Sequence, residues 1–481
     1  MPERLRYRDD PFSLAPPERW ALGARATQAV RRARAGAGEA LASLTIPLRT
    51  PVDPSAVVAA ARRPGEPWFC FEQPDRDGAA LAGLGAVREL HAAGEDRFAR
   101  VAAAWRRLAA GAAADPPEGP LGAGLVAVGG FAFAPDGGSS PHWLSFPPAG
   151  LVVPEVALAR RAGETWLTVT ALAAPDDTED DLVARVQTRL AELSLVHELP
   201  LLDPVPAGRV HVASALPPEH YEHAVAQAVE RIRGGELEKV VLAREVRVHA
   251  PAPHDPAAVL GVLREAFPSC YVYCVGRGSA TFLGASPELL VRREGQRAST
   301  VALAGSTRRS ADPAVDDHLG ERLLQSDKDR HEQAVVTRRI ERALRPHALW
   351  VTAAREPRVV RVANIQHLAT PIRAQLAKPL GAVELAAILH PTPAVGGEPA
   401  SVAAPLIPRL EGLDRGWYAG PIGWTDAVED GEFCVGLRCA LLDGAVGHCF
   451  AGCGIVADSD PGAELAETEV KLEALLPVLS A

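Results

Sequence analysis

One lysine stands out as a group that could carry out proton chemistry. Lys239 lies in the stretch Leu237–Val248, whose alternating apolar residues predict a buried strand. The chain has 50 lysines and arginines, and only four of them are lysines: Lys239, Lys328, Lys378 and Lys471. A buried lysine can lose its proton, whereas an arginine cannot, so Lys239 is a candidate base. The alternative is a lysine near a strand end whose ammonium group reaches water.

A candidate acid follows the lysine strand. Glu288 comes after the turn residues Ser286 and Pro287 and leads into an apolar run. Burial would raise the pKa of its carboxyl group and make it a general acid; the alternative is a turn residue whose carboxylate is satisfied locally. Further along, Gly305 and Ser306 are small enough to let the backbone approach a ligand closely.

Two pairs of acidic residues share the faces of predicted helices. The first pair lies in a helix expected over residues 317–344, and the second in a helix that begins after Asp460, with Lys471 one turn further on. The four acids are Asp329, Glu332, Glu464 and Glu467. Carboxylates from two helices could hold a magnesium ion that keeps water ligands. The alternative for either helix is a solvated face, with a Glu467–Lys471 surface pair on the second.

An arginine and two glycines in late strands indicate an anionic ligand. Arg438 interrupts an apolar strand, where its guanidinium group is expected to meet a carboxylate. Gly452 and Gly454 leave backbone N–H groups open to an anion. Together these features predict a small, multiply anionic, metal-bound substrate.

The elements around these residues predict an α/β protein of the α+β type. Strands are expected at 67–74 and 124–135, with a helix over 88–114 between them. Residues 22–44 could form a helix or a mobile arm, and 200–207 read as a connecting segment. We therefore divide the chain into a divergent part, 1–205, that packs on a catalytic part, 206–481.

Composition narrows the class of protein. A net charge of −10 argues against a nucleic-acid surface, and no apolar run is long enough to predict a membrane span. The seven cysteines, an odd number mostly in apolar strand-like runs, are typical of a reduced cytoplasmic protein.

Nine motifs in order resemble those of the chorismate-utilising enzymes. They are EKVVLAR, FLGASPELL, LAGSTRR, SDKDRHE, QHLATPI, HPTPA, GEFCVGLRCA, AGCGIV and ELAETEVK, all between residues 238 and 471. The resemblance implies the anthranilate synthase component I-like fold, in which large mixed or antiparallel sheets are flanked by helices. It also implies a magnesium site and chorismate as the substrate.

The resemblance assigns roles to individual residues. Glu332 and Glu467 would bind Mg²⁺ directly, Asp329 and Glu464 would help through water, and the ion would hold the ring carboxylate of chorismate. The predicted substrate-binding residues are Gly305, Ser306, His367, Ala394, Arg438, Gly452, Gly454 and Lys471.

Within the family, the resemblance is greatest to isochorismate synthases. In those members a lysine at the position of Lys239 activates water, and a glutamate at the position of Glu288 protonates the leaving hydroxyl group. Salicylate synthases tend to have threonine where Ala394 stands, so alanine favours stopping at isochorismate. We expect a monomer without a glutaminase subunit that serves menaquinone or siderophore biosynthesis. The alternatives are salicylate synthase, anthranilate synthase and a non-catalytic chorismate-binding protein.

Overall fold

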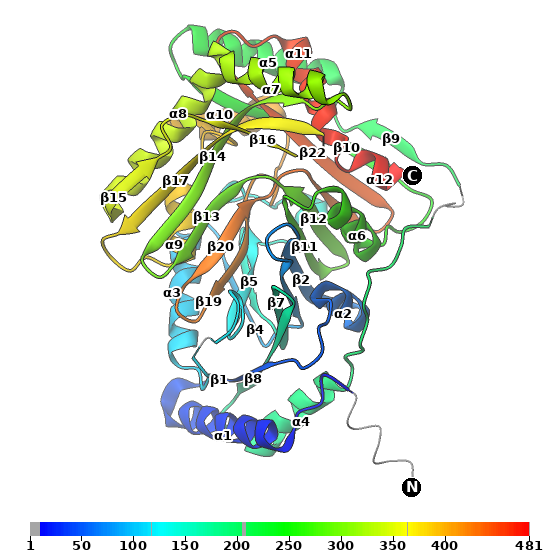
Figure 1. Ribbon diagram of the computed structural model, residues 1–481, viewed down its shortest axis with the longest axis vertical. Coiled ribbons are helices and arrows are strands. Elements are labelled where there is room, and N and C mark those ends of the chain that lie inside the picture. The colour runs from blue at the N-terminus through cyan, green and yellow to red at the C-terminus, as the bar shows by residue number, and fades with distance from the viewer. Residues whose placement is uncertain (1–9, 117, 204–207, 363, 481) are drawn as a thin grey trace.

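Two antiparallel sheets form the framework of the protein (Figure 1). The computed structural model describes residues 10–116, 118–203, 208–362 and 364–480. Within these ranges the first sheet has twelve strands. In spatial order they are β1 (Ala40–Pro47), β8 (Glu164–Ala173), β7 (Val156–Arg161), β3 (Ala79–Leu84), β2 (Gly65–Gln73), β11 (Tyr271–Gly278), β12 (Ala280–Ser286), β21 (Cys439–Asp443), β22 (Val446–Ile455), β10 (Lys239–His249) and β18 (Gly397–Glu398), with β9 (His211–Ser214) also paired to β10.

The second sheet has ten strands in the described residues. Their order is β15 (Ala348–Ala353), β17 (Ile365–Leu376), β14 (Arg297–Arg308), β13 (Leu289–Glu294), β20 (Gly431–Val435), β19 (Pro421–Asp426), β5 (Val126–Phe131), β6 (Ala149–Val153) and β4 (Arg88–Ala92), with β16 (Arg358–Arg361) on β17. Strands from both sides of residue 205 pair in both sheets, through β2 with β11 and β5 with β19. The division at 205 remains a prediction.

Helices cover the outer faces of both sheets (Figure 1). Those that pack near the first sheet are α1 (Pro16–Arg32), α2 (Pro54–Ala61), α4 (Glu179–Leu190), α6 (Pro256–Ala266) and α12 (Leu476–Ser480). Those on the second are α3 (Arg97–Ala110), α7 (Pro313–Gln325), α8 (Asp327–Leu344) and α9 (Ala382–Leu389). Over β10, β18 and β22 lie α5 (Pro218–Arg233), α10 (Ala400–Glu411) and α11 (Pro461–Leu472). Short helical turns occur at Ala33–Ala37, Pro141–Trp143 and Arg345–His347.

The main core lies between the sheets. Phe71, Tyr273 and Phe282 of the first sheet share one buried cluster with Phe131 and Phe433 of the second. Burial of such large apolar side chains is the main stabilising contribution to folding. The core thus fixes the two sheets against each other, which matters because the site described below takes residues from both.

The predicted fold class is confirmed, and several predicted boundaries are wrong. The helix expected over 88–114 begins only at Arg97, because residues 88–92 pair with β6 instead. Residues 22–44 contain the end of α1 and the start of β1. The helix expected over 317–344 is two helices, because Ser326 has extended dihedral angles and caps α8.

Three other predictions concern the connecting segment, the cysteines and membrane spans. Residues 204–207 of the expected connecting segment lie outside the described residues. The seven cysteines are buried and free of disulfides. No helix in the described part of the chain combines the length and hydropathy needed to cross a membrane.

Candidate active site

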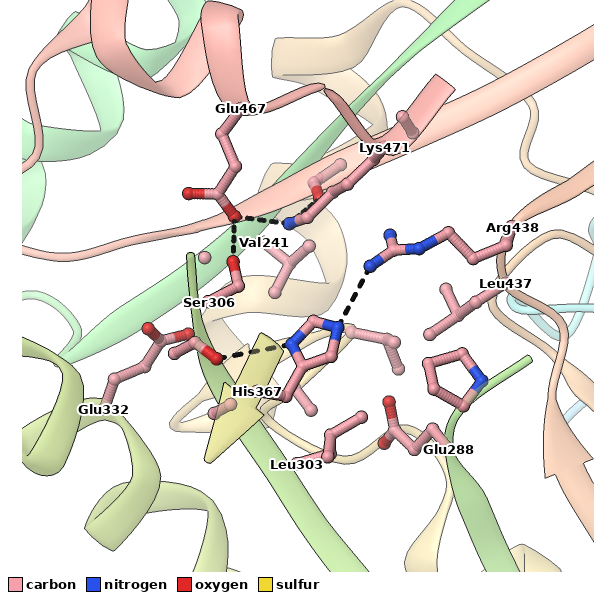
Figure 2. A pocket seen from close by; sticks show the side chains of 18 of the residues that line it. Val241, Glu288, Leu303, Ser306, Glu332, His367, Leu437, Arg438, Glu467 and Lys471 are labelled. Carbon is pink, nitrogen blue, oxygen red and sulfur yellow. Dashed lines mark hydrogen bonds and ion pairs between the residues drawn. The ribbon is translucent and has the colours of Figure 1, made fainter. Parts of the chain in front are cut away.

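Thirteen of the fourteen predicted site residues line a single cavity (Figure 2). The cavity has an empty volume of about 790 Å³, including its opening, and lies where β10 and β22 of the first sheet meet β14 and β17 of the second. The lining set comprises Glu288, Gly305, Ser306, Asp329, Glu332, His367, Ala394, Arg438, Gly452, Gly454, Glu464, Glu467 and Lys471. The fourteenth, Lys239, is directly behind this lining.

The two acidic pairs come together from two helices. Asp329 and Glu332 lie in the first turns of α8, and Glu464 and Glu467 lie on α11. Both helices begin at a side-chain cap: Ser326 accepts from the backbone N–H of Asp329, and Asp460 accepts from that of Ala463. These caps fix where each helix starts, and therefore where its carboxylates point.

Three of the four lysines of the chain neutralise three of the four carboxylates. Lys239 Nζ is 2.7 Å from Glu332 Oε1, Lys328 Nζ is 3.1 Å from Glu464 Oε1, and Lys471 Nζ is 2.6 Å from Glu467 Oε1. Lys328 was not predicted as a site residue. The sequence does contain two clues to Lys328: lysine is scarce in this chain, and Lys328 lies in the motif SDKDRHE.

The pKa values of three of these carboxyl groups are shifted, in different directions. Burial raises the pKa of Glu464 and of Asp329, and a neighbouring carboxylate adds to the effect in each case. Burial also acts against the charged form of Glu467, but Lys471 and Ser306 outweigh it and hold its pKa at about 2. Ser306 Oγ donates to Glu467 Oε1 over 2.8 Å. The cluster is therefore crowded with negative charge and rich in oxygen ligands.

Lys239 is the first residue of β10, whereas the alternation over Leu237–Val248 predicts a strand that begins before it. Its exposed fraction is 1%, which excludes the alternative of an ammonium group in water. The side chain lies beside Gly454 of β22: a Cβ atom at that glycine would be 2.7 Å from Lys239 Cε. Gly454 thus has a structural reason to lack a side chain, in addition to its predicted contact with an anion.

Arg438 has no carboxylate partner among the described residues, contrary to the prediction. Its Nη2 donates to Nε2 of His367 over 3.1 Å (Figure 2). Burial, with the charge of Arg438, lowers the pKa of His367 to about 3, so the imidazole is neutral. Since Nε2 accepts from Arg438, the ring proton is on Nδ1, 3.3 Å from the carbonyl oxygen of Gly305. Arg438 as a residue is 8% exposed, and its guanidinium carries a charge that a ligand carboxylate could balance.

Glu288 lies on the other side of the cavity from Glu467 (Figure 2). Burial raises its pKa to about 8, although Lys239 and Thr392 act in the opposite direction. Its backbone is held at both ends: its N–H donates to Ser286 Oγ, and its carbonyl accepts from the N–H of Val435. Near neutral pH the carboxyl group is therefore mostly protonated and can donate a proton.

Apolar side chains complete the wall. The cavity is also lined by Val241, Leu303, Tyr418, Leu437 and Phe450. A ligand with a carboxylate on an apolar ring could place the ring on this wall and the carboxylate among the cations.

The comparisons with known proteins agree with this geometry. Residues 27–480 match the family model described as chorismate binding enzyme, so the chain belongs to that family. A salicylate biosynthesis isochorismate synthase from Pseudomonas aeruginosa is 40% identical over 431 residues, covering 90% of this chain and 88% of that protein. The isochorismate synthase MenF of Bacillus subtilis is 32% identical over 416 residues, or 85% and 87% of the two chains.

A solved structure extends the similarity to three dimensions. The menaquinone-specific isochorismate synthase MenF from Escherichia coli superimposes with a TM-score of 0.76 at 28% identity, covering 92% of this chain and 95% of that one.

Proposed function

We propose that this protein is an isochorismate synthase that converts chorismate to isochorismate with Mg²⁺. The observation that carries the proposal is Glu288, a buried carboxyl group with a pKa of about 8. It shares the cavity with Arg438, whose guanidinium has no carboxylate partner in the described part of the chain. One group can protonate a leaving hydroxyl and the other can hold a substrate carboxylate. Relatives named isochorismate synthases at 40% and 32% identity support the assignment.

The residues of the chain divide the reaction between them. Lys239, in its neutral amine form, takes a proton from water, and the water adds to the ring carbon beside the one that bears the carboxylate. Glu288 protonates the hydroxyl group as it departs. Arg438 and Lys471 hold carboxylates of the substrate, while the apolar wall orients the ring.

The acidic cluster fits a magnesium ion. Its donors are carboxylate oxygens from Asp329, Glu332, Glu464 and Glu467, which line one cavity, and hard cations prefer oxygen ligands. Glu332 and Glu467 would bind the ion, with Asp329 and Glu464 acting through water. When bound, Mg²⁺ would supply positive charge that polarises the substrate.

The function is tested by product analysis. The protein is incubated with chorismate and Mg²⁺ without ammonia, the products are separated by chromatography, and pyruvate is assayed. We expect isochorismate without pyruvate. Salicylate with pyruvate would instead identify a salicylate synthase. Turnover only after ammonia is added would contradict the proposal that Lys239 activates water.

Removal of the metal is expected to abolish turnover. Protein treated with EDTA and dialysed should form no isochorismate, and added Mg²⁺ should restore the rate. Because only the folded protein assembles the four carboxylates, Mg²⁺ at 100 times its dissociation constant should stabilise it by about 2.7 kcal/mol. Thermal unfolding with and without Mg²⁺ measures this, and Glu467→Gln should weaken the stabilisation. Full activity in EDTA would contradict the metal assignment.

A further inference from the structure

A buried ion pair lies behind the apolar wall of the cavity. Arg415, in the loop after α10, binds Glu411 at the end of that helix, and the exposed fractions of the two residues are 4% and 3%. Arg415 Nε donates to Glu411 Oε2 over 3.0 Å, and Nη2 donates to Glu411 Oε1. A buried pair of this kind gains little from its charges alone, so its other bonds decide what it does.

The remaining bonds of the pair go to backbone atoms of the catalytic cavity. Arg415 Nη1 donates to the carbonyl oxygen of Val395 over 2.8 Å, and Nη2 donates to that of Val241 over 3.0 Å. Val241 is on β10 and Val395 follows the HPTPA motif, and both line the cavity. The planar guanidinium therefore joins two wall segments that are 154 positions apart in the sequence.

The same arginine also holds an aromatic part of the wall. The backbone N–H of Tyr418 donates to the carbonyl oxygen of Arg415 over 2.8 Å, and the guanidinium lies 5.6 Å from the centre of the Tyr418 ring. Glu411, the other member of the ion pair, also contacts β10. Its Oε1 accepts from the backbone N–H of Ala243 over 2.7 Å.

The far side of the pair is not packed solid. Arg415 and Glu411 also line a second cavity, with an empty volume of about 1940 Å³ including open space, together with Phe133 and His390. On this side the guanidinium lies 4.2 Å from the centre of the Phe133 ring, which leaves the rest of the pair facing open space. The side-chain hydrogen bonds of Arg415 join these wall segments in addition to a backbone bond, in which the N–H of Val241 donates to the carbonyl oxygen of Gly396 over 2.7 Å.

We propose that Arg415, held by Glu411, is a positioning residue that fixes the apolar wall against which the substrate ring binds. The proposal rests on the proposed function for the identity of the ligand, chorismate. It does not concern the metal, because none of the hydrogen-bond partners of Arg415 is one of the four clustered carboxylates.

The test replaces Arg415 by lysine, which keeps the charge beside Glu411 but cannot bond Val241, Val395 and Glu411 together. We expect Arg415→Lys to weaken chorismate binding by about 10- to 100-fold, because small misplacements at a site have effects of this size. Calorimetry with Mg²⁺ present measures the chorismate dissociation constant, with Glu288→Gln added to each protein so that chorismate is not consumed during the titration. Steady-state kinetics should show a raised KM, and the dissociation constant for Mg²⁺ should be unchanged.

A half-buried arginine that also bonds carboxylates supplies the control. Arg264 of α6 binds Asp53 and Glu72, and none of the three lines the catalytic cavity. Arg264→Lys should lower the melting temperature without changing chorismate affinity. Equal affinities of Arg415→Lys and wild type for chorismate, or equal losses in the two lysine variants, would overturn the proposal.

Two further outcomes are informative. If Arg415→Lys fails to fold, Glu411→Gln is tested in its place. Glutamine keeps an acceptor for the N–H of Ala243 and removes the negative charge that holds Arg415. Unchanged chorismate binding by Glu411→Gln would overturn the proposal. If wild type makes no isochorismate but Arg415→Lys weakens chorismate binding, the proposed function fails and the positioning role stands.

Discussion

Replacement of Lys239 by methionine is expected to lower kcat for isochorismate formation by about 10²- to 10⁴-fold, the usual contribution of a general base. Methionine has a similar length and suits a site in which the lysine is 1% exposed, so the fold should remain. The loss should fall on kcat, because Lys239 lies behind the cavity lining and is predicted to act on water rather than on the carboxylates of the substrate. Steady-state kinetics with chromatographic detection of isochorismate measures it.

Two controls separate proton transfer from simple charge. Lys239→Arg retains a positive charge beside Glu332 but cannot give up its proton, so it should be as inactive as the methionine variant. Lys378→Met removes an exposed lysine and should turn over at the wild-type rate. An active arginine variant would show that Lys239 serves only to balance Glu332, and the base would have to be sought elsewhere.

The sequence predicted residues better than it predicted their partners. The alternation around Lys239 indicated a buried lysine, and the structure confirms that it is buried. Its partner Glu332 is 93 positions away, and no local pattern indicates that this ammonium group and a carboxylate of the acidic cluster share one hydrogen bond. Arg438 shows the same limit. Its predicted place in an apolar strand indicated a carboxylate partner, but Arg438 lies in the bend between β20 and β21, and its partner is a neutral imidazole.

Local signals explain some of the wrong boundaries. The pattern from Ser326 to Asp329 is a capping sequence, and it marks a new helix inside the stretch predicted as continuous. This break determines where one site carboxylate lies, because it places Asp329 in the first turn of α8. By contrast, residues 88–92 form a strand only because β6 lies beside them, and pairing with a distant strand outweighs the helical preference of an alanine-rich stretch.

The ion pair of Arg415 and Glu411 was outside the reach of pattern analysis altogether. The two residues are four positions apart, which by itself predicts an exposed pair on a helix. Their burial depends on α10 packing against β10, and the contacts with Val241 and Val395 depend on how that strand and the loop meet. Such features follow from the assembled sheets rather than from any single segment.

Replacement of Glu288 by glutamine is expected to lower kcat by about 10²- to 10⁴-fold as well, since glutamine keeps the shape of the side chain but has no proton to donate. In wild type the pKa of about 8 should appear directly in the pH profile. The protonated form is the active one, so kcat/KM should fall as the pH rises through about 8. Glu219 is an exposed acid on α5, so Glu219→Gln should keep both the wild-type rate and the fall in kcat/KM as the pH rises through about 8.

Unfolding gives an independent measure of the same carboxyl group. The pKa of Glu288 in the folded protein is raised above the ordinary value of 4.5, so the folded state keeps a proton that the unfolded chain releases. Its contribution to stability is therefore fully present below about pH 4.5 and is lost by about 1.4 kcal/mol per pH unit up to about pH 8. Denaturant unfolding at several pH values should show that Glu288→Gln removes this slope, whereas Glu219→Gln does not. An unchanged slope in Glu288→Gln would mean that Glu288 is already ionised at neutral pH, and it could then no longer serve as the acid.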